Sequence, residues 1–470
     1  MKIFENENGT ITKEWAKFIA SIRYEDLPSE VVNSVKISVL DTIGAMLAGT
    51  TSQTYKSIMK LVTAWGGKQE STLIGEGIKI PAAYAALSNA IAARVRELDD
   101  ALEMLPFHAS AVVVPVALAM AEQKGFLNGK DFITAIALGV DIAGRMGLAS
   151  KTTGINRVPS ARSIWGTIGA ATVACKVYGL DEKKILNALG LAYRLGGGNE
   201  VIGARNSSDE TIWLGCGKDA MDGVLACSLA REGFAGPSDV IEAYYCSFER
   251  GEYHRDALLD NLGVKFVITQ TSLKAWPTCR MTHAAIDGTL QLVFLYDILP
   301  DDVDQIIVSL NRLAYERVCL PLEKTRNPKS LTDALFSVPF TVATAIIKKR
   351  VSLIDLTEKI VNDANILSMS RKVVPKLNPE IKHPVGRPPA IVEIKTTNGL
   401  SYIKQIEYIK GHPFKNPLTQ QERISKFMDC ASIAKKPLSR AEVENTMNFV
   451  DHLEEMNDVK ELPQFIFNRD

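Results

Sequence analysis

The stretch RELDDALEMLPFHAS brings three acidic residues close to a histidine. Glu97, Asp99 and Asp100 close an Ala-rich segment that follows Pro81 and predicts a helix, with proline at a favoured first-turn position. On such a helix Glu97 and Asp100 share one face, and Asp99 points about 100° away from Asp100. Acids at a helix C-terminus oppose the helix dipole, so their clustering suggests a functional role; a solvated acidic face is the structural alternative.

His108 stands directly before residues 109–123, an apolar segment that predicts a helix. A helix N-terminus carries free N–H groups and positive dipole charge, which suit a substrate carboxylate. The same charge disfavours the imidazolium form and leaves a neutral imidazole that can take or give a proton at about pH 7. We therefore predict that His108 is a general acid/base oriented by Asp99 or Asp100; a simple helix cap is the alternative.

A second group of chemically capable residues lies in SLKAWPTCRMTHAAIDG. Lys274, Arg280 and His283 surround a turn, and such a set can bind carboxylates, arginine in bidentate fashion. His283 and Asp287 are one helical turn apart and could pair. Ordinary surface charges on a connector explain the same pattern. Cys279 is expected to be a small buried residue rather than a nucleophile.

Two further segments combine polar residues with the expected start of a helix. RVPSARSIWGTIGAA contains Ser160 and Arg162, and GARNSSDETIWLGCG contains Arg205 and Glu210. Both segments are candidates for substrate binding. N-capping by serine and solvated loop charges are the local alternatives.

The elements that must position these residues are mostly helical in the first half of the chain. Apolar residues recur there at helical spacing, and small residues dominate, as close helix packing requires. The predicted helices cover residues 12–23, 29–48, 82–100, 109–123, 130–150, 163–178, 182–195, 214–232 and 238–245.

The pattern changes near residue 265, where alternating and β-branched segments predict strands. The predicted strands cover residues 264–268, 304–310, 390–400 and 401–409, with Asn398-Gly399 as a hairpin turn between the last two. Helices are predicted among them at residues 282–296, 331–348 and 355–363, and after Pro417 at residues 421–434 and 439–456. We therefore expect a mainly α protein, with a large all-helical domain (1–268), a smaller α+β lid domain (269–411), and C-terminal helices (412–470) that return to the helical domain.

The bulk composition argues against several classes of partner and cofactor. The 54 Lys and Arg residues balance 54 Asp and Glu residues, so no global field attracts nucleic acid or an anionic membrane. The seven cysteines are scattered without a C-x-x-C pair, which argues against a disulfide framework and a zinc site. We expect a cytoplasmic protein without a metal, an organic cofactor, a signal peptide or a membrane span.

Six segments resemble, in order, those of the MmgE/PrpD family, which includes methylcitrate dehydratases, cis-aconitate decarboxylases and an iminodisuccinate epimerase. They are VLDTIGAMLAG (39–49), the acidic cluster with His108-Ala-Ser, GTIGAATVACKVYGLD (166–181), GFAGP (233–237), LKAWPTC (273–279) with His283, and DALFSVPFTVA (333–343). The resemblance covers nearly the whole chain. It implies a helical domain built from both chain ends, an α+β lid between them, a homodimer, and chemistry without a cofactor.

At the catalytic positions this resemblance is partial. The acidic cluster and His108 resemble the family's acid and histidine pair, with slightly longer spacing and with Glu97 in place of an Asp. Ser160 stands where family decarboxylases and dehydratases carry a second histidine, and Glu210 stands where they carry a lysine. Both changes remove a potential cation, which argues against a tricarboxylate substrate unless nearby arginines replace the charge.

Three functional hypotheses follow from these residues and from the resemblance. The first is a lyase, a dehydratase or a decarboxylase, acting next to a carboxylate of a small polycarboxylic or hydroxy acid. Lys274 and Arg280 would stabilise the developing enediolate, and His108 would move the proton. The second is an epimerase or isomerase that returns the proton to another face or carbon. The third is a non-catalytic homologue that binds a ligand or partner, supported by Ser160 and Glu210.

Overall fold

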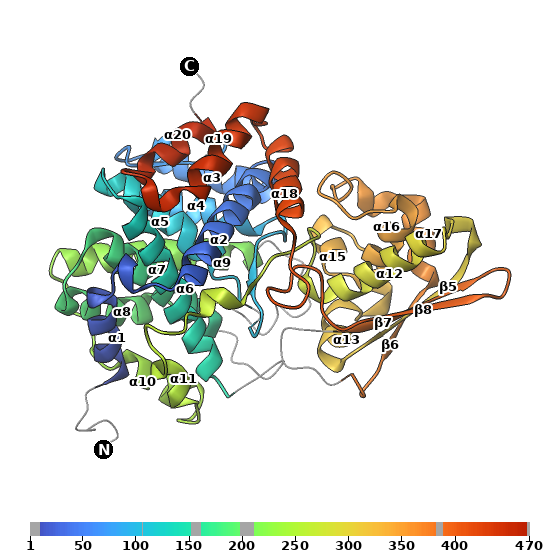
Figure 1. Ribbon diagram of the computed structural model, residues 1–470, viewed down its shortest axis with the longest axis horizontal. Coiled ribbons are helices and arrows are strands. Elements are labelled where there is room, and N and C mark those ends of the chain that lie inside the picture. The colour runs from blue at the N-terminus through green and yellow to red at the C-terminus, as the bar shows by residue number, and fades with distance from the viewer. Residues whose placement is uncertain (1–9, 106, 152–160, 198–210, 382–388, 468–470) are drawn as a thin grey trace.

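Helices rich in small and apolar residues form the larger part of the molecule in the computed structural model (Figure 1). The structure describes residues 10–105, 107–151, 161–197, 211–381 and 389–467. The helices before the first long strand are α1 (Ile11–Ser21), α2 (Ser29–Gly49), α3 (Gln53–Trp65), α4 (Ala82–Arg94), α5 (Ser110–Lys124), α6 (Gly129–Ala149), α7 (Ala161–Tyr178), α8 (Glu182–Leu195), α9 (Thr211–Arg231), α10 (Val240–Phe248), α11 (Arg255–Leu259) and α12 (His283–Leu295). Later helices are α13 (Arg312–Val318), α14 (Leu322–Arg326), α15 (Leu331–Leu335), α16 (Val338–Lys348), α17 (Ala364–Lys372), α18 (Gln420–Ser432), α19 (Arg440–Asp451) and α20 (Leu462–Phe467).

Glycines allow neighbouring helices of the first part to approach closely. A Cβ added at Gly49 of α2 would lie 1.9 Å from the Ala92 carbonyl oxygen of α4. A Cβ added at Gly223 of α9 would lie 2.2 Å from the Ala170 Cβ of α7. These distances are far below van der Waals contact, so only glycine permits the observed helix spacing.

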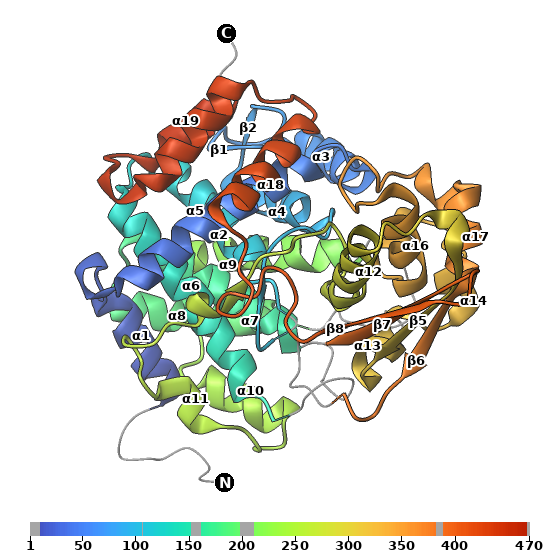
Figure 2. The ribbon, with the colours of Figure 1, turned by 45° about the vertical axis from the view of Figure 1, so that its right-hand side comes forward.

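One hydrophobic core joins both ends of the chain. It runs from Ile11 to Ile268 and continues with residues from Phe427 to Ile466. The C-terminal helices lie over α2 in both ribbon views (Figures 1 and 2), and α18 contacts it directly. α2 and α6 are long and apolar enough to cross a bilayer, but 72% and 94% of their most apolar windows are buried inside the protein, as in core helices.

The second part is built around a four-stranded mixed sheet in the order β6-β5-β7-β8. The strands are β5 (Val303–Leu310), β6 (Val373–Leu377), β7 (Ala390–Thr396) and β8 (Ser401–Ile406). β5 pairs parallel with β6, and the other pairs are antiparallel. Burial alternates along β7, and α12, α16 and α17 lie on one side of the sheet (Figure 2). The sheet and its helices enclose a hydrophobic core of their own, made of buried residues between Cys279 and Ile409. The predicted fold class, mainly α with an α+β part, is confirmed.

The predicted strand at residues 264–268 is wrong. Residues Val267–Gln270 form a 3-10 helix instead, with Val267 and Ile268 buried next to α6. The Asp141 carboxylate accepts the Val267 N–H at 2.8 Å. A side chain thus satisfies a backbone donor that would otherwise need a neighbouring strand, and β-branched residues fill the core without a sheet.

Two predicted helices of the second part also differ from the structure. The helix predicted at residues 331–348 is divided into α15 and α16, because the Ser337 hydroxyl accepts from Phe340 N and starts a new helix. Residues 355–363 contain only the 3-10 turn Ile360–Asn362. The Asp363 carboxylate then caps α17, which the sequence did not predict, as it did not predict α13, α14 and β6.

Candidate active site

A short two-stranded ladder holds two distant segments side by side. β3 (Ala101–Leu102) directly follows the acidic residues, and β4 (Thr271–Ser272) closely precedes Lys274. The two strands pair antiparallel. Their pairing places the loop of residues 95–100, called the acidic loop below, against the connection to the second part of the molecule.

The acidic loop begins where α4 ends. The Ala-rich helix stops at Arg94, and Glu97 has a left-handed φ of 50°, so the prediction that Glu97 and Asp100 share a helix face is wrong. The Arg94 guanidinium explains the turn. It donates to Glu97 Oε1 at 2.8 Å and to Asp99 Oδ1 at 2.7 Å, and these bonds need the chain to fold back over the helix end. Two charge-assisted bonds offset the cost of one left-handed residue.

Lys274 completes a buried set of two cations and two carboxylates. Its side chain is fully buried, and its Nζ lies 2.7 Å from Glu97 Oε2 and 3.6 Å from Asp99 Oδ1. Arg94, Glu97 and Asp99 are also buried. Burying these charges is tolerable because each has a close partner of opposite sign. In this state the ammonium group of Lys274, predicted to bind substrate, faces protein carboxylates.

His108 joins this set through a single ring nitrogen. Its Nδ1 lies 2.8 Å from the Asp100 carbonyl oxygen, 2.9 Å from Asp99 Oδ2 and 3.4 Å from Arg94 Nη1. Because both close neighbours are acceptors, Nδ1 carries the hydrogen and Nε2 keeps the lone pair in the neutral ring. The His108 side chain is 21% exposed, whereas those of Asp99 and Lys274 are 0% exposed. His108 is thus the member of the group that solvent and substrate can reach.

The electrostatics favour a neutral imidazole beside ionised carboxylates. Burial and the Arg94 charge lower the pKa of His108 below 6.5, with Asp99 opposing and Lys274 adding to the fall. Burial raises the pKa values of Glu97 and Asp99, but Arg94, Lys274 and His108 together overcome it and hold both pKa values well below their ordinary range. The site therefore contains a neutral base, His108, next to a carboxylate, Asp99, that stays ionised.

Asp100 differs from its neighbours because its carboxyl group faces no cation at close range. Burial, and then the charge of Asp41 on α2, raises its pKa to about 7. The nearby Ser110 and Ser38 hydroxyls oppose that rise. Asp100 therefore changes protonation near neutral pH, while its backbone oxygen positions His108.

Arg280 and His283, the other two candidates of the Lys274 segment, also contact residues near the β3–β4 ladder or in their own segment. Arg280 forms an ion pair with Glu103 and lies 3.4 Å from the Leu102 carbonyl oxygen. His283 begins α12, is fully buried, and has its Nε2 3.3 Å from the Thr278 carbonyl oxygen. Burial and the nearby Lys274 and Arg280 charges lower its pKa to about 3.

The suggested pairing of His283 with Asp287 is wrong. His283 Nδ1 has no hydrogen-bond partner in the described part of the chain, and Asp287 Oδ1 accepts from Gln291 at 2.8 Å. One helical turn separates the two residues, but the side chain of Asp287 is directed to the next turn of α12.

Other candidates cannot be placed against this site. Ser160, Glu210 and Arg205 lie outside the described residues, and Arg162 is described only as part of the α7 backbone. Their assignment to substrate binding stays a prediction. In the described ranges, no group of three His, Cys, Asp or Glu side chains is arranged to hold a metal ion.

Sequence reasoning missed Arg94, Glu103 and Asp41. Arg94 had a usable signal, since an Arg three residues before an acid at a helix end can close a salt bridge. Glu103 and Asp41 had none, because their partners Arg280 and Asp100 become neighbours only through tertiary packing.

Comparison with known proteins identifies the family of this chain. Residues 13–250 match the MmgE/PrpD N-terminal domain, and residues 276–454 match the MmgE/PrpD C-terminal domain. Cis-aconitate decarboxylase of Homo sapiens is 25% identical over 475 residues, covering 96% of this chain and 93% of the relative. The enzyme of the same name from Aspergillus terreus (strain NIH 2624 / FGSC A1156) is 22% identical, with 97% and 96% covered. Because the two domain matches span most of its length, this chain belongs to the MmgE/PrpD family.

Proposed function

We propose that the protein is a lyase that makes or discharges a carbanion next to a carboxylate of a small polycarboxylic or hydroxy acid, without a cofactor. The observation that carries this proposal is the geometry of His108. Its Nδ1 faces the Asp99 carboxylate and the Asp100 carbonyl oxygen, which leaves Nε2 as the basic nitrogen of a side chain that is 21% exposed. The low pKa of His108 keeps that base neutral at physiological pH.

In dehydration, Nε2 of His108 would take the proton from the carbon next to the carboxylate. The C–H electron pair would form the enediolate and then the C=C bond, and the neighbouring hydroxyl would leave as water after receiving a proton. In decarboxylation, the C–C bond to CO2 would break instead and leave its electron pair on the carbon next to the remaining carboxylate. Nε2 of His108 would take up a proton from solvent and pass it to this carbon. Asp99 stabilises the imidazolium in both reactions, because it lies 2.9 Å from Nδ1.

The developing negative charge needs cations and N–H donors. The N-terminus of α5, which begins two residues after His108, supplies dipole charge and N–H groups. Lys274 remains our candidate partner for a substrate carboxylate. That role requires its ion pairs with Glu97 and Asp99 to loosen when substrate enters.

The comparisons support this class of reaction but leave the substrate open. The relatives are named cis-aconitate decarboxylases, and the human one is 25% identical to this chain. Ser160 and Glu210 replace two residues expected in family decarboxylases. We therefore propose a small carboxylic acid with fewer charges than a tricarboxylate as the substrate.

A second candidate is an epimerase that uses the same carbanion. It is favoured by a second neutral imidazole, because burial, and then nearby cations that include Lys274, lower the pKa values of both His108 and His283. Two neutral bases near one lysine suit removal of a proton on one face and its return on the other.

The test is incubation of the purified protein with panels of citrate-like, aconitate-like, hydroxy and amino diacids in D2O, followed by proton NMR. Loss of water or CO2 would support the lyase. Solvent deuterium in recovered or inverted substrate, without loss of water or CO2, would favour the epimerase. Ligand binding without either change across the panel would contradict both and favour a non-catalytic homologue.

A further inference from the structure

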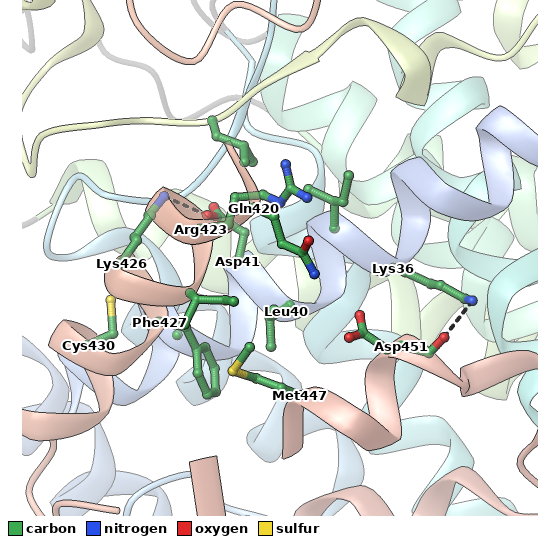
Figure 3. A pocket seen from close by; sticks show the side chains of 14 residues that line it. Lys36, Leu40, Asp41, Gln420, Arg423, Lys426, Phe427, Cys430, Met447 and Asp451 are labelled. Carbon is green, nitrogen blue, oxygen red and sulfur yellow. Dashed lines mark hydrogen bonds and ion pairs between the residues drawn. The ribbon is translucent and has the colours of Figure 1, made fainter. Parts of the chain in front are cut away.

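A cavity lies between α2 and the C-terminal helices α18 and α19, next to the residue that follows β4. It has a volume of about 70 Å³ and is lined by residues of α2, α18 and α19 together with Leu273 (Figure 3). This space is enough for several water molecules or one small acid. Neither His108 nor the buried Arg94, Asp99 and Lys274 line it, so it is separate from the candidate active site.

The cavity is lined by apolar side chains on one part and by polar side chains on another. Leu40, Phe427 and Met447 form the apolar part, and the side chains of Gln420 and Arg423 point into the space beside them (Figure 3). Such a combination suits a small molecule with one short apolar end and one polar end.

The cations around the cavity are not equally engaged. Lys36 pairs with Glu454 at 2.5 Å. Lys426 pairs with Asp41 at 2.5 Å. Among the described residues, the contact of the Arg423 guanidinium is with one backbone carbonyl oxygen, at 2.8 Å. Most of its five N–H donors therefore remain available to an anion, and an arginine fork fits a carboxylate.

Asp41 favours a ligand that carries a hydrogen-bond donor. It lines the cavity, its side chain is 4% exposed, and its Oδ1 is held by Lys426. Its Oδ2 is buried and has no hydrogen-bond partner within the described ranges. A buried carboxylate oxygen without a partner is costly, so a ligand with an O–H group beside its carboxylate would satisfy it.

We propose that this cavity is a second binding site, for a small hydroxy carboxylate. The ligand carboxylate binds Arg423 and the Gln420 amide, its hydroxyl donates to Asp41 Oδ2, and its short apolar end packs on Phe427 and Met447. This assignment does not rest on the proposed reaction, because it concerns binding of a ligand at Arg423, Gln420 and Asp41 and not proton transfer at His108.

Occupation of the cavity reaches the acidic loop through Lys426. Besides pairing with Asp41, Lys426 Nζ donates to the Leu98 carbonyl oxygen at 2.8 Å, and Leu98 stands between Glu97 and Asp99. A ligand that bonds Asp41 changes the environment of this bridge. The site is therefore a point at which a hydroxy acid regulates the position of the acidic loop.

The experiment is titration of the protein with 2-hydroxybutanoate by calorimetry, in the wild type and in two matched variants. Arg423→Gln removes the proposed anchor. Arg440→Gln removes an equal charge from the exposed face of α19, where Arg440 is 86% exposed and pairs with Glu444. We expect Arg423→Gln to weaken binding by about tenfold or more, as loss of a charged contact should, and Arg440→Gln to leave it unchanged.

Hydrogen exchange on the wild type locates the probe without any substitution. We expect 2-hydroxybutanoate to slow amide exchange in α18 and in residues 95–100. Equal affinity in wild type and Arg423→Gln, no binding up to about 50 mM, or protection at residues 107–112 without protection of α18 would each overturn the proposal. None of these results depends on turnover, so they are distinguishable from a failure of the proposed reaction.

Discussion

At the residue scale, one arginine organises the candidate site. Arg94 contacts Glu97 and Asp99 directly, and its charge helps to keep His108 neutral. The acids keep their negative charge because cations surround them, whereas Asp100, without such a partner, has a pKa of about 7. Adjacent carboxyl groups in one loop therefore have different protonation states at neutral pH.

Asp100→Asn should change how stability depends on pH. The folded pKa of Asp100 is raised from 3.8 to about 7, so its protonated form stabilises the fold fully below about pH 3.8 and this contribution is lost as the pH rises through 7. Asparagine cannot ionise. We expect the variant to gain stability relative to the wild type between pH 5 and pH 8, by at most about 3 kcal/mol, because only the span from pH 5 to the folded pKa contributes. Urea denaturation of both proteins at pH 5 and pH 8 measures this change in the free energy of unfolding. A difference between variant and wild type that is the same at both pH values would contradict the raised pKa of Asp100.

Lys274→Met should destabilise the protein strongly, by about 3–5 kcal/mol, because it leaves the buried Glu97 carboxylate without one of its two cations. Adding Glu97→Gln should recover part of the loss. The control is Lys349→Met, whose exposed pair with Asp297 should contribute about 1 kcal/mol or less. Equal costs for the two lysine variants in urea denaturation would refute the buried network.

At the element scale, periodicity predicted most of the long helices and the β7–β8 hairpin, because each depends on neighbouring residues, but it missed α3. Thr10 caps α1 and Gly399 has a φ of 85° in the turn, both as local signals indicate. The early end of α4 was not predictable in this way. Helical spacing continues past Arg94, and the ion pairs that hold the folded-back chain involve both Arg94 and Lys274, which lies 177 residues from Glu97 in sequence. Similarly, the strand predicted at residues 264–268 failed because Asp141, from another helix, satisfies its backbone.

Gly223→Ala should destabilise the α7–α9 contact. An added Cβ would meet the Ala170 carbonyl carbon at 2.7 Å, and backbone cannot move as a flexible side chain can. Overpacking of this kind costs about 1–3 kcal/mol. Gly215→Ala on the same helix is the matched control, since nothing lies within 4 Å of its Cβ. The control should be neutral or stabilising by up to about 1 kcal/mol; melting temperatures that fall equally in both would argue against close packing.

At the scale of the whole molecule, the chain ends share one core and the sheet has another. The ladder of β3 and β4 and the ion pairs of Lys274 connect the part that contains His108 to the part that contains His283. The domain boundaries at residues 268 and 411 stay a prediction, as do the roles of the site residues. The sequence could identify His108 and Lys274 as residues able to carry the chemistry of the site. It could not identify which charged side chains pair with each other, because those pairs form only in the packed structure.

We predict that the protein is a homodimer, as the family resemblance implied. Leu214 and Leu225, which lie on one face of α9, are 45% and 40% exposed in the single chain, and this apolar face suits a partner surface. Light scattering should give twice the chain mass of 51.4 kDa. A mass of one chain across the working concentration range would contradict the prediction.

The central claim is that His108 carries the proton to and from the carbon next to the substrate carboxylate. The most direct measurement is proton NMR in D2O, comparing His108→Asn with the wild type on any acid that the panel shows to react. We predict that the variant keeps its melting temperature, since the asparagine amide can still donate to the Asp100 carbonyl oxygen, and that its turnover or deuterium incorporation falls by about a hundred- to ten-thousand-fold. Wild-type rates in His108→Asn would contradict the account.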